Sequence, residues 1–158
     1  MGSTVCQAVQ DAEGLELVAR LDVGDRIVPA TLGGAQVAVD FTVPDVTEAN
    51  VHALIEAGVD AVVGTTGWTE ESYARVAEHL ARPEAAGRAV LIAPNFALSA
   101  VLAMGFAARA ARYFESVEVI ELHHPDKVDA PSGTAAATAR AVAAARAEAG
   151  LGVSPDAT

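Results

Sequence analysis

The chain has 158 residues, of which 52% are hydrophobic and only 4% aromatic, and its formal net charge is −11. This length allows a domain with a substantial core, which must be built from Ala, Val, Leu and Ile, and the hydrophobic fraction excludes a disordered chain. The negative charge argues against nucleic acid or an anionic membrane as a partner, because both call for a basic face. A small anionic substrate needs only a few local cations and stays compatible.

Short runs rich in Val, Ile and Leu alternate with helical patterns along the chain. Helices are predicted at residues 2–12, 45–57, 69–81, 97–114 and 132–149. Strands are predicted at residues 15–22, 36–41, 60–64, 89–93 and 117–123. The helix at 69–81 has the clearest start, because Thr69 can cap it and Glu70 and Glu71 suit the positive end of its dipole.

The strand pattern indicates a parallel sheet covered by helices on both faces, since a run such as 61–63 is apolar throughout instead of alternating. Alternating strands and helices predict a doubly wound α/β fold, in which ligands bind beyond the carboxyl ends of the strands. Small and polar residues follow every predicted strand: Asp22, Asp40 to Thr42, Gly64 to Gly67, Ala93 to Phe96, and a His-His segment. Such residues are common in any turn, but five such ends together favour a binding site.

The number of cysteines and the N-terminal composition indicate the cellular compartment in which the protein is expected. Cys6 is the only cysteine, so no intramolecular disulfide forms and a reducing cytoplasm is expected. No basic segment followed by an apolar segment marks a signal peptide. Residues 89–108 carry no charge, and their length would suit a membrane span, but Pro94 and Asn95 divide them. A buried strand, turn and helix is therefore predicted there.

The N-terminus resembles the end of a dinucleotide-binding turn. Met1 and Gly2 lead directly into the first helical pattern, and Asp22 follows Gly2 by 20 residues. That is the usual offset from a glycine turn to the acid that binds a ribose hydroxyl. The spacing suggests a Rossmann unit without its first strand, although one Gly and one Asp also fit an ordinary helix start.

Lys127 is the only lysine among ten basic residues. It lies close to His123 and His124, and lysine can release a proton whereas arginine effectively cannot. A histidine in this position can act as a general acid near neutral pH. This segment is therefore the first candidate for chemistry, with an ordinary surface histidine pair as the alternative.

The residues after Lys127 are suited to bind an anion. Ser132, Gly133 and Thr134 open an Ala-rich helix, whose free amides and dipole attract a carboxylate. Neighbouring residues of a strand face opposite sides, so His123 and His124 are not expected to share a metal ion. No Cys or His lies at ligand spacing either, and no metal site is predicted.

These segments resemble one enzyme family. Glu121-Leu-His-His-Pro-Asp-Lys-Val-Asp-Ala-Pro-Ser-Gly-Thr-Ala135 is similar to the signature of the dihydrodipicolinate (4-hydroxy-tetrahydrodipicolinate) reductases of bacterial lysine and diaminopimelate biosynthesis. The segments at 40–42, 63–67 and 93–96 resemble further motifs of that family, in the same order and spacing. The resemblance covers essentially the whole chain, and the signature from the His pair to Thr134 is its most specific part.

The resemblance implies catalytic and substrate-binding roles. His123 would donate a proton to the carbon beside the one that receives hydride, and Lys127 would be a second catalytic acid that also binds substrate. The residues implied in holding the carboxylates of a small dicarboxylate substrate are His124, Lys127, Ser132, Gly133 and Thr134. The reaction would reduce 4-hydroxy-tetrahydrodipicolinate to tetrahydrodipicolinate with loss of water.

The same resemblance implies NADH or NADPH as the cofactor. The residues implied in binding it are Met1, Asp22, Phe41, Gly64, Thr65, Thr66, Ala93, Pro94, Asn95 and Phe96. Asp22 would bind the adenosine ribose, while nearby Arg26 could meet a 2′-phosphate, so the choice between the two nucleotides stays open. Family members are cytoplasmic homotetramers.

The chain also departs from the family pattern at both ends. Family members begin with a strand and a glycine-rich turn, of which only Met1 and Gly2 remain, and they continue beyond Thr158. We therefore expect a fragment, with residues 1–96 as a partial dinucleotide-binding domain and 97–158 as the start of an α+β substrate-binding and tetramerisation domain. Weak cofactor binding and low stability are expected of the chain alone. The alternatives are another Rossmann-type oxidoreductase of a small carboxylate and a catalytically inactive remnant.

Overall fold

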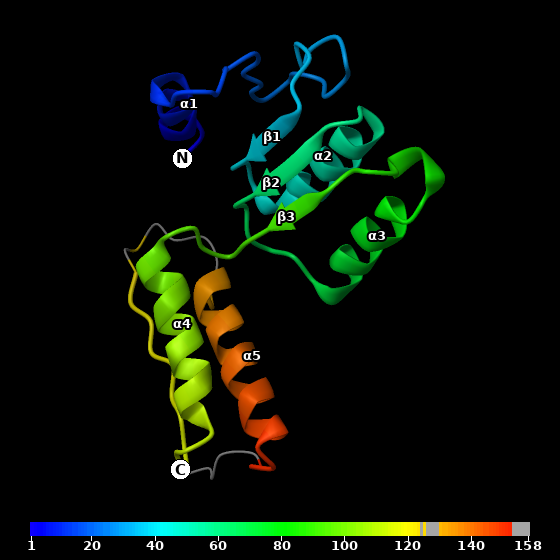
Figure 1. Cartoon of the computed structure of the whole chain (residues 1–158). Coiled ribbons are helices and arrows are strands. Elements are labelled where there is room, and N and C mark those ends of the chain that lie inside the picture. The colour runs from blue at the N-terminus through cyan, green and yellow to red at the C-terminus, as the bar shows by residue number, and fades with distance from the viewer. Residues whose placement is uncertain (124, 126–129, 153–158) are drawn as a thin grey trace. The chain divides into compact units, whose positions relative to one another are not determined.

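The computed structural model describes residues 1–123, 125 and 130–152. It contains two compact units, Met1–Ala93 and Pro94–Thr158. The first unit holds a sheet with its helices, and the second holds a pair of helices and an extended segment (Figure 1).

A three-stranded parallel sheet lies at the centre of the first unit. Its strands, in order across the sheet, are β1 (Val37–Asp40), β2 (Asp60–Val63) and β3 (Val90–Ile92). The register of β1 and β2 places Asp40 opposite Val63 at the carboxyl edge and Val37 opposite Asp60 at the other. The loops that follow Asp40 and Val63 therefore leave the same edge of the sheet side by side.

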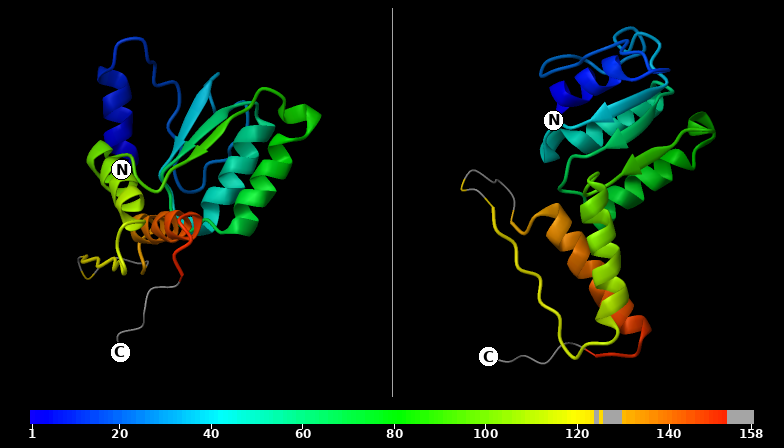
Figure 2. Two further views of the ribbon diagram at one scale, coloured as in Figure 1. Left: turned by 60° about the horizontal axis from the view of Figure 1, so that its bottom comes forward. Right: turned by 60° about the vertical axis from the view of Figure 1, so that its left-hand side comes forward.

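Helices cover the sheet of the first unit from two sides. The connecting helices α2 (Pro44–Glu56) and α3 (Glu70–Leu80) lie on one side, and α1 (Gly2–Asp11) lies on the other, near β1 (Figure 2). A short 3-10 helix, η1 (Pro83–Ala85), leads from α3 towards β3. The prediction of an α/β fold with a parallel sheet flanked by helices is confirmed.

The core of the first unit consists of small aliphatic side chains. Val51 of α2 and Val63 of β2 are completely buried. The other members of the buried cluster are Leu32, Leu54, Ile55, Val59, Ala61, Val76 and Ala85. Burial of one Val, Leu or Ile side chain contributes about 1.5–3 kcal/mol. The core thus accounts for the apolar character of the short strands.

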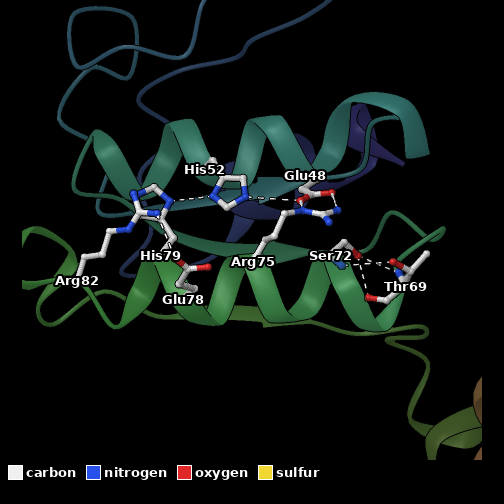
Figure 3. Close-up of polar contacts among 8 residues, drawn as sticks. All are labelled: Glu48, His52, Thr69, Ser72, Arg75, Glu78, His79 and Arg82. Atoms are coloured by element: carbon white, nitrogen blue, oxygen red, sulfur yellow. Dashed lines mark hydrogen bonds and ion pairs between the residues drawn. The ribbon is translucent and has the colours of Figure 1, made fainter.

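The start of α3 follows from its sequence. The Oγ1 atom of Thr69 accepts a hydrogen bond from the Ser72 amide at 3.2 Å, and the Ser72 Oγ atom accepts one from the Thr69 amide at 2.8 Å (Figure 3). This reciprocal cap satisfies amides that a helix start leaves without partners. The prediction that Thr69 caps this helix is confirmed.

Polar contacts fix α3 against α2 (Figure 3). The Arg75 guanidinium donates to both carboxylate oxygens of Glu48, at 2.6 and 2.9 Å. The hydrogen bond from Arg75 is the main cause that lowers the pKa of Glu48. Further along the same interface the Nδ1 atoms of His52 and His79 lie 2.7 Å apart, so one ring donates and the other accepts.

The second unit is organised by two helices, α4 (Leu98–Ala111) and α5 (Gly133–Glu148), which pack on each other. The buried side chain of Arg146 donates to the carbonyl oxygens of Ala111 at 3.3 Å and Phe114 at 2.6 Å. Ala111 is the last residue of α4 and Phe114 lies three residues beyond it, so Arg146 of α5 binds carbonyl groups at and just after the end of the other helix.

The uncharged stretch 89–108 forms β3, a turn and most of α4, as predicted. Across the described residues, the structure contains no helix with the length and apolar character needed to cross a membrane.

Two strand predictions are wrong. Residues 15–22 and 117–123 have no regular secondary structure. A strand requires a neighbour that pairs its backbone groups, and in the described part of the chain neither segment has such a neighbour. The first instead packs against a turn, where a Cβ atom on Gly33 would lie 2.8 Å from the Val18 carbonyl oxygen.

Candidate functional site

A hollow of about 260 Å³ opens in the first unit at the carboxyl ends of β1 and β2. Its lining residues are Met1, Phe41, Thr42, Pro44, Gly64, Thr65 and Thr66. The structure thus brings together five predicted cofactor residues, which come from three separate parts of the sequence. Thr42 and Pro44 are additional lining residues. Their positions directly after β1 were the available signal, because parallel strands place such residues at one edge.

Close packing joins the two loops around this hollow. A Cβ atom on Gly64 would lie 2.0 Å from the Phe41 ring, and one on Gly67 would lie 2.7 Å from the Pro44 side chain. Gly67 also has a φ of +93°, which other residues rarely adopt. The glycine positions in this turn therefore allow the loop after β2 to contact the loop after β1.

Asp40 connects the same two loops by hydrogen bonds. Its Oδ1 atom accepts from the Thr42 amide at 2.9 Å, the Thr42 hydroxyl at 2.7 Å and the Thr65 hydroxyl at 3.0 Å. Its Oδ2 atom accepts from Nδ2 of Asn50 at 2.9 Å. The sequence places Asp40 within a motif without giving it a role, and nothing in the local sequence indicates Asn50, which reaches the site from α2.

Asp22 is not among the residues that line this hollow. It is exposed in a turn, where its Oδ1 atom accepts from the Val23 amide at 2.8 Å and its amide donates to Asp25 Oδ2 at 2.8 Å. The predicted position of Asp22 at the end of a strand is wrong, because residues 15–22 form no strand.

Within the second unit, the structure joins a predicted cofactor segment to a predicted substrate residue. Nδ2 of Asn95 donates to the Thr134 hydroxyl at 3.2 Å, and that hydroxyl donates to the Pro94 carbonyl at 3.2 Å. The Oδ1 atom of Asn95 also accepts from the Ala97 amide at 2.8 Å. Of the other two residues in this motif, Ala93 belongs to the first unit, where its amide donates to Val63, and Phe96 is half exposed.

A carboxylate organises the start of α5. Glu121 accepts from the Ser132 amide at 2.9 Å, and its other oxygen lies 3.0 Å from Nε2 of His123. Hydrogen bonding by Ser132, with a smaller contribution from His123, lowers the pKa of Glu121. Ser132 also caps α5, since its Oγ atom accepts from the Ala135 amide at 3.1 Å. Glu121 thus ties the predicted proton donor to the predicted substrate-binding helix start, and its position in the signature was the signal for it.

The remaining predicted residues fall into two groups. Gly133 and Thr134 begin α5, where helix amides have no intrahelical acceptor and can bind an anion. His124 and Lys127 lie outside the described residues. In the ranges that the structure covers, no group of three His, Cys, Asp or Glu side chains could hold a metal ion.

Comparisons with known proteins give consistent matches over the chain. The family model described as "Dihydrodipicolinate reductase, N-terminus" matches residues 1–96, and its C-terminal counterpart matches residues 99–155. The 4-hydroxy-tetrahydrodipicolinate reductases of Beutenbergia cavernae and Nocardia farcinica are 66% and 56% identical to the chain over 158 residues. These matches cover 100% of this chain but 63% of each relative.

A solved structure has a similar fold. The dipicolinate-bound dihydrodipicolinate reductase from Paenisporosarcina sp. TG-14 matches with a TM-score of 0.67 and 34% sequence identity. The match covers 92% of this chain and 62% of that one. The chain therefore spans somewhat less than two thirds of the length of the proteins that it resembles.

Proposed function

We propose, on the premise that this chain belongs to the dihydrodipicolinate reductase family, that it contributes cofactor and substrate sites to the NAD(P)H-dependent reduction of 4-hydroxy-tetrahydrodipicolinate. The product is tetrahydrodipicolinate, and one water molecule is released. The observation that carries this proposal is the hydrogen bond between Asn95 of the cofactor motif and Thr134 of the substrate motif.

The hollow in the first unit fits the nicotinamide half of a pyridine nucleotide. Phe41 and Gly64 supply apolar surface for a flat ring, and Thr42 and Thr66 supply hydroxyl groups. Asp22 is exposed, and its carboxylate can accept hydrogen bonds from a ribose. Either NADH or NADPH fits this proposal, because Arg26, four residues further along, can meet a 2′-phosphate.

When bound, the nucleotide supplies the hydride, and the residues of this chain position the substrate and transfer protons. His123 donates a proton to the carbon next to the one that is reduced, and Lys127 is the second acid. The residues that hold the two substrate carboxylates are His124, Lys127, Ser132, Gly133 and Thr134. The first amides of α5, which have no intrahelical acceptor, and the dipole of the helix support an anion at this position.

The assembly proposed for the complete protein is a cytoplasmic homotetramer. Exposed apolar side chains along α4, such as Leu98, Val101 and Phe106, support an interface on this unit. Light scattering on a size-exclusion column tests the assembly, and a monomer at micromolar concentration would contradict it.

The reductase assay needs a protein with both ends of the family sequence. We define the completed protein as these 158 residues joined to the parts of the Beutenbergia cavernae relative that lie outside the match. The completed protein should oxidise NADH or NADPH in the presence of 4-hydroxy-tetrahydrodipicolinate and not with other oxo acids. Activity only with another small carboxylate would favour a different oxidoreductase, and no activity at all would favour an inactive remnant.

A substitution of Lys127 tests the proposed reaction chemistry. Lys127→Ala should lower turnover by about 10²–10⁴-fold, the usual contribution of a general acid, while nucleotide binding stays unchanged. The matched control is Arg82→Ala, which removes an exposed cation from the turn between α3 and η1 and should leave turnover unaltered. For the 158-residue chain alone, weak nucleotide binding is expected, and tight binding would overturn that expectation.

A further inference from the structure

We infer that Asp40 is the positioning residue of the nucleotide site, which it builds by fixing two loops and by orienting the hydroxyl groups that face the ligand. The identity of this ligand as a nicotinamide nucleotide rests on the proposed function. The inference starts from the surroundings of the Asp40 carboxylate, which is 6% exposed and lies at the last position of β1.

The hydrogen bonds to this carboxylate come from neutral donors. Four of them reach it from Thr42, Thr65 and Asn50. Among the residues described by the structure, no Lys, Arg or His forms an ion pair with it. Burying a carboxylate costs free energy unless its oxygens are hydrogen-bonded. Moving one of these donors away would therefore destabilise the fold, which keeps the donors in place.

These donors come from three separate elements. Thr42 belongs to the loop after β1, Thr65 to the loop after β2, and Asn50 to α2. The backbone of Asp40 contributes as well, because its carbonyl oxygen accepts from the Gly64 amide at 2.9 Å. One residue at the edge of the sheet thus connects both loops that line the hollow with the helix behind them.

The loop after β2 is held from its other side too. The Thr65 carbonyl oxygen accepts from the indole of Trp68 at 3.1 Å. Thr65 is therefore fixed at its hydroxyl by Asp40 and at its carbonyl by Trp68, and its side chain is buried. Removing the Asp40 carboxylate would free the hydroxyl end and leave the indole contact intact.

The direction of these hydrogen bonds determines what the hollow offers to a ligand. A carboxylate only accepts, so the hydroxyl groups of Thr42 and Thr65 must both donate their protons to Asp40. The Thr42 hydroxyl oxygen also accepts from Nδ2 of Asn50 at 3.4 Å, so towards a ligand in the hollow the two threonines offer only the oxygen lone pairs that remain. Such lone pairs suit a ligand group with N–H donors, as in the carboxamide of nicotinamide, and disfavour a carboxylate at the same position.

Asp60 supplies a matched control in the same sheet. It lies at the opposite end of the strands, and its Oδ1 atom accepts from the Ala89 amide at 3.0 Å and pairs with Arg88 at 3.2 Å. Asp60→Asn removes the charge that pairs with Arg88 and leaves the loops at the hollow unchanged. It separates a general loss of stability from a loss of loop positioning.

The first measurement is hydrogen exchange without any nucleotide, in the 158-residue chain and in the completed protein. Asp40→Ala should speed exchange of the Thr42 amide by about tenfold or more, equivalent to about 1.4 kcal/mol, because that amide loses its acceptor. Asp60→Asn should leave this amide unchanged. Equal exchange at Thr42 in Asp40→Ala and in the parent protein would overturn the inference.

The second measurement is nucleotide affinity in variants that exchange the side chains of Asp40 and Asn50. Asn50→Asp places two carboxylates where an amide and a carboxylate now meet at 2.9 Å, so the affinity of the completed protein for NADH and NADPH should fall about tenfold or more. Asp40→Asn combined with Asn50→Asp restores one amide facing one carboxylate and should recover affinity to within about threefold. Failure of this double variant to recover affinity, with Asn50→Asp impaired, would contradict the assignment even if Asp40→Ala does not fold.

The third measurement separates positioning from stability and tests ligand polarity. Asp40→Ala should raise KM for the nucleotide more than it lowers kcat, whereas Asp60→Asn should change neither at equal thermal stability. The completed protein should prefer NADH to reduced nicotinic acid adenine dinucleotide, which carries a carboxylate in place of the carboxamide, and this preference should shrink in Asp40→Ala. Equal binding of the two dinucleotides would overturn the polarity argument.

The proposed function and this inference fail in different ways. If the parent completed protein binds no NADH or NADPH, the proposed function fails and the nucleotide role of Asp40 fails with it. If the parent binds nucleotide and the Asp40 and Asn50 variants bind it equally well, the proposed function stands and the inference alone is overturned.

Discussion

Two carboxylates organise the two candidate regions of this chain, and their surroundings differ. Asp40 is buried, and the described residues that donate hydrogen bonds to its carboxylate are neutral amides and hydroxyls. Glu121 is half-exposed, and one of its oxygens faces His123, while the other binds the amide of Ser132. The first carboxylate accepts from amide and hydroxyl groups, whereas the second contacts an imidazole, whose ring nitrogens can donate or accept a proton.

This difference separates a binding region from a region suited to proton transfer. The donors around Asp40 keep fixed directions and give the first unit a preformed hollow. The imidazole beside Glu121 is the proton donor that we propose, and its Nε2 atom lies 3.0 Å from the carboxylate. Variants in the two regions should therefore have distinct kinetic consequences, which the following predictions test.

The largest effect is expected from the proton donor. His123→Ala should lower turnover of the completed protein by about 10²–10⁴-fold, as for other general acids, with unchanged nucleotide affinity. Steady-state kinetics and a fluorescence titration with NADH measure the two quantities. Leu122→Ala, at an exposed neighbouring position, should have little effect. A large loss of nucleotide affinity in His123→Ala would erase the distinction between the two regions.

The next effect concerns the binding region. Gly64→Ala introduces a Cβ atom where the Phe41 ring now lies, at 2.0 Å, so the ring must move. We expect a loss of about 1–3 kcal/mol in the free energy of unfolding, as for other overpacked sites, together with weaker nucleotide binding. Chemical denaturation and NADH titration provide the measurements.

Gly105→Ala is the control for that glycine substitution. Gly105 lies in α4, where an added Cβ atom would have open space around it, and alanine there should stabilise the helix by about 0.5–1 kcal/mol. If Gly64→Ala behaves like Gly105→Ala, close packing of the two loops does not shape the hollow.

A smaller effect is expected from the carboxylate beside the proton donor. Glu121→Gln keeps an acceptor for the Ser132 amide but removes the charge that faces His123. Turnover should fall about tenfold, which corresponds to about 1.4 kcal/mol in the activation free energy, and nucleotide affinity should not change. A full pH–rate profile should change shape in this variant, and it should keep its shape in Glu118→Gln, which alters an exposed acid nearby.

The smallest effect is expected from a carboxylate that belongs to neither region. Hydrogen bonding by Arg75 lowers the pKa of Glu48 in the folded protein, so this contribution to stability is present above the unfolded pKa of about 4.3 and is lost as the pH falls through the lower folded value. Glu48→Gln should cost up to about 1 kcal/mol at neutral pH, since the pair is partly exposed.

Denaturant unfolding at several pH values measures that contribution. The difference between Glu48→Gln and the parent protein should disappear in acid. Glu78→Gln should show no difference at any pH, because Glu78 and Arg82 form an exposed pair at 3.8 Å. A reductase defect in Glu48→Gln would show that the interface of α2 and α3 also influences catalysis.

Much of the fold could be predicted from local sequence patterns. Within the described residues, the three strands of the sheet and the five α-helices lie where hydrophobic runs, Thr69 and the Ala-rich segment indicated them. The strands predicted at 15–22 and 117–123 failed because their hydrophobic pattern carries no information about a pairing partner. A helix makes its hydrogen bonds within its own segment, whereas a strand depends on residues elsewhere in the chain.

The candidate site divides in the same way. The sequence by itself determined the reactive residue types, the caps and the motif order, because residue chemistry and local turn geometry depend on neighbouring residues. Only the tertiary structure decided that Asp40 accepts hydrogen bonds from Thr42, Thr65 and Asn50 together, and that Asn95 donates one to Thr134. These contacts join residues up to 39 positions apart, and they exist because strand register and helix packing bring the groups within hydrogen-bonding distance.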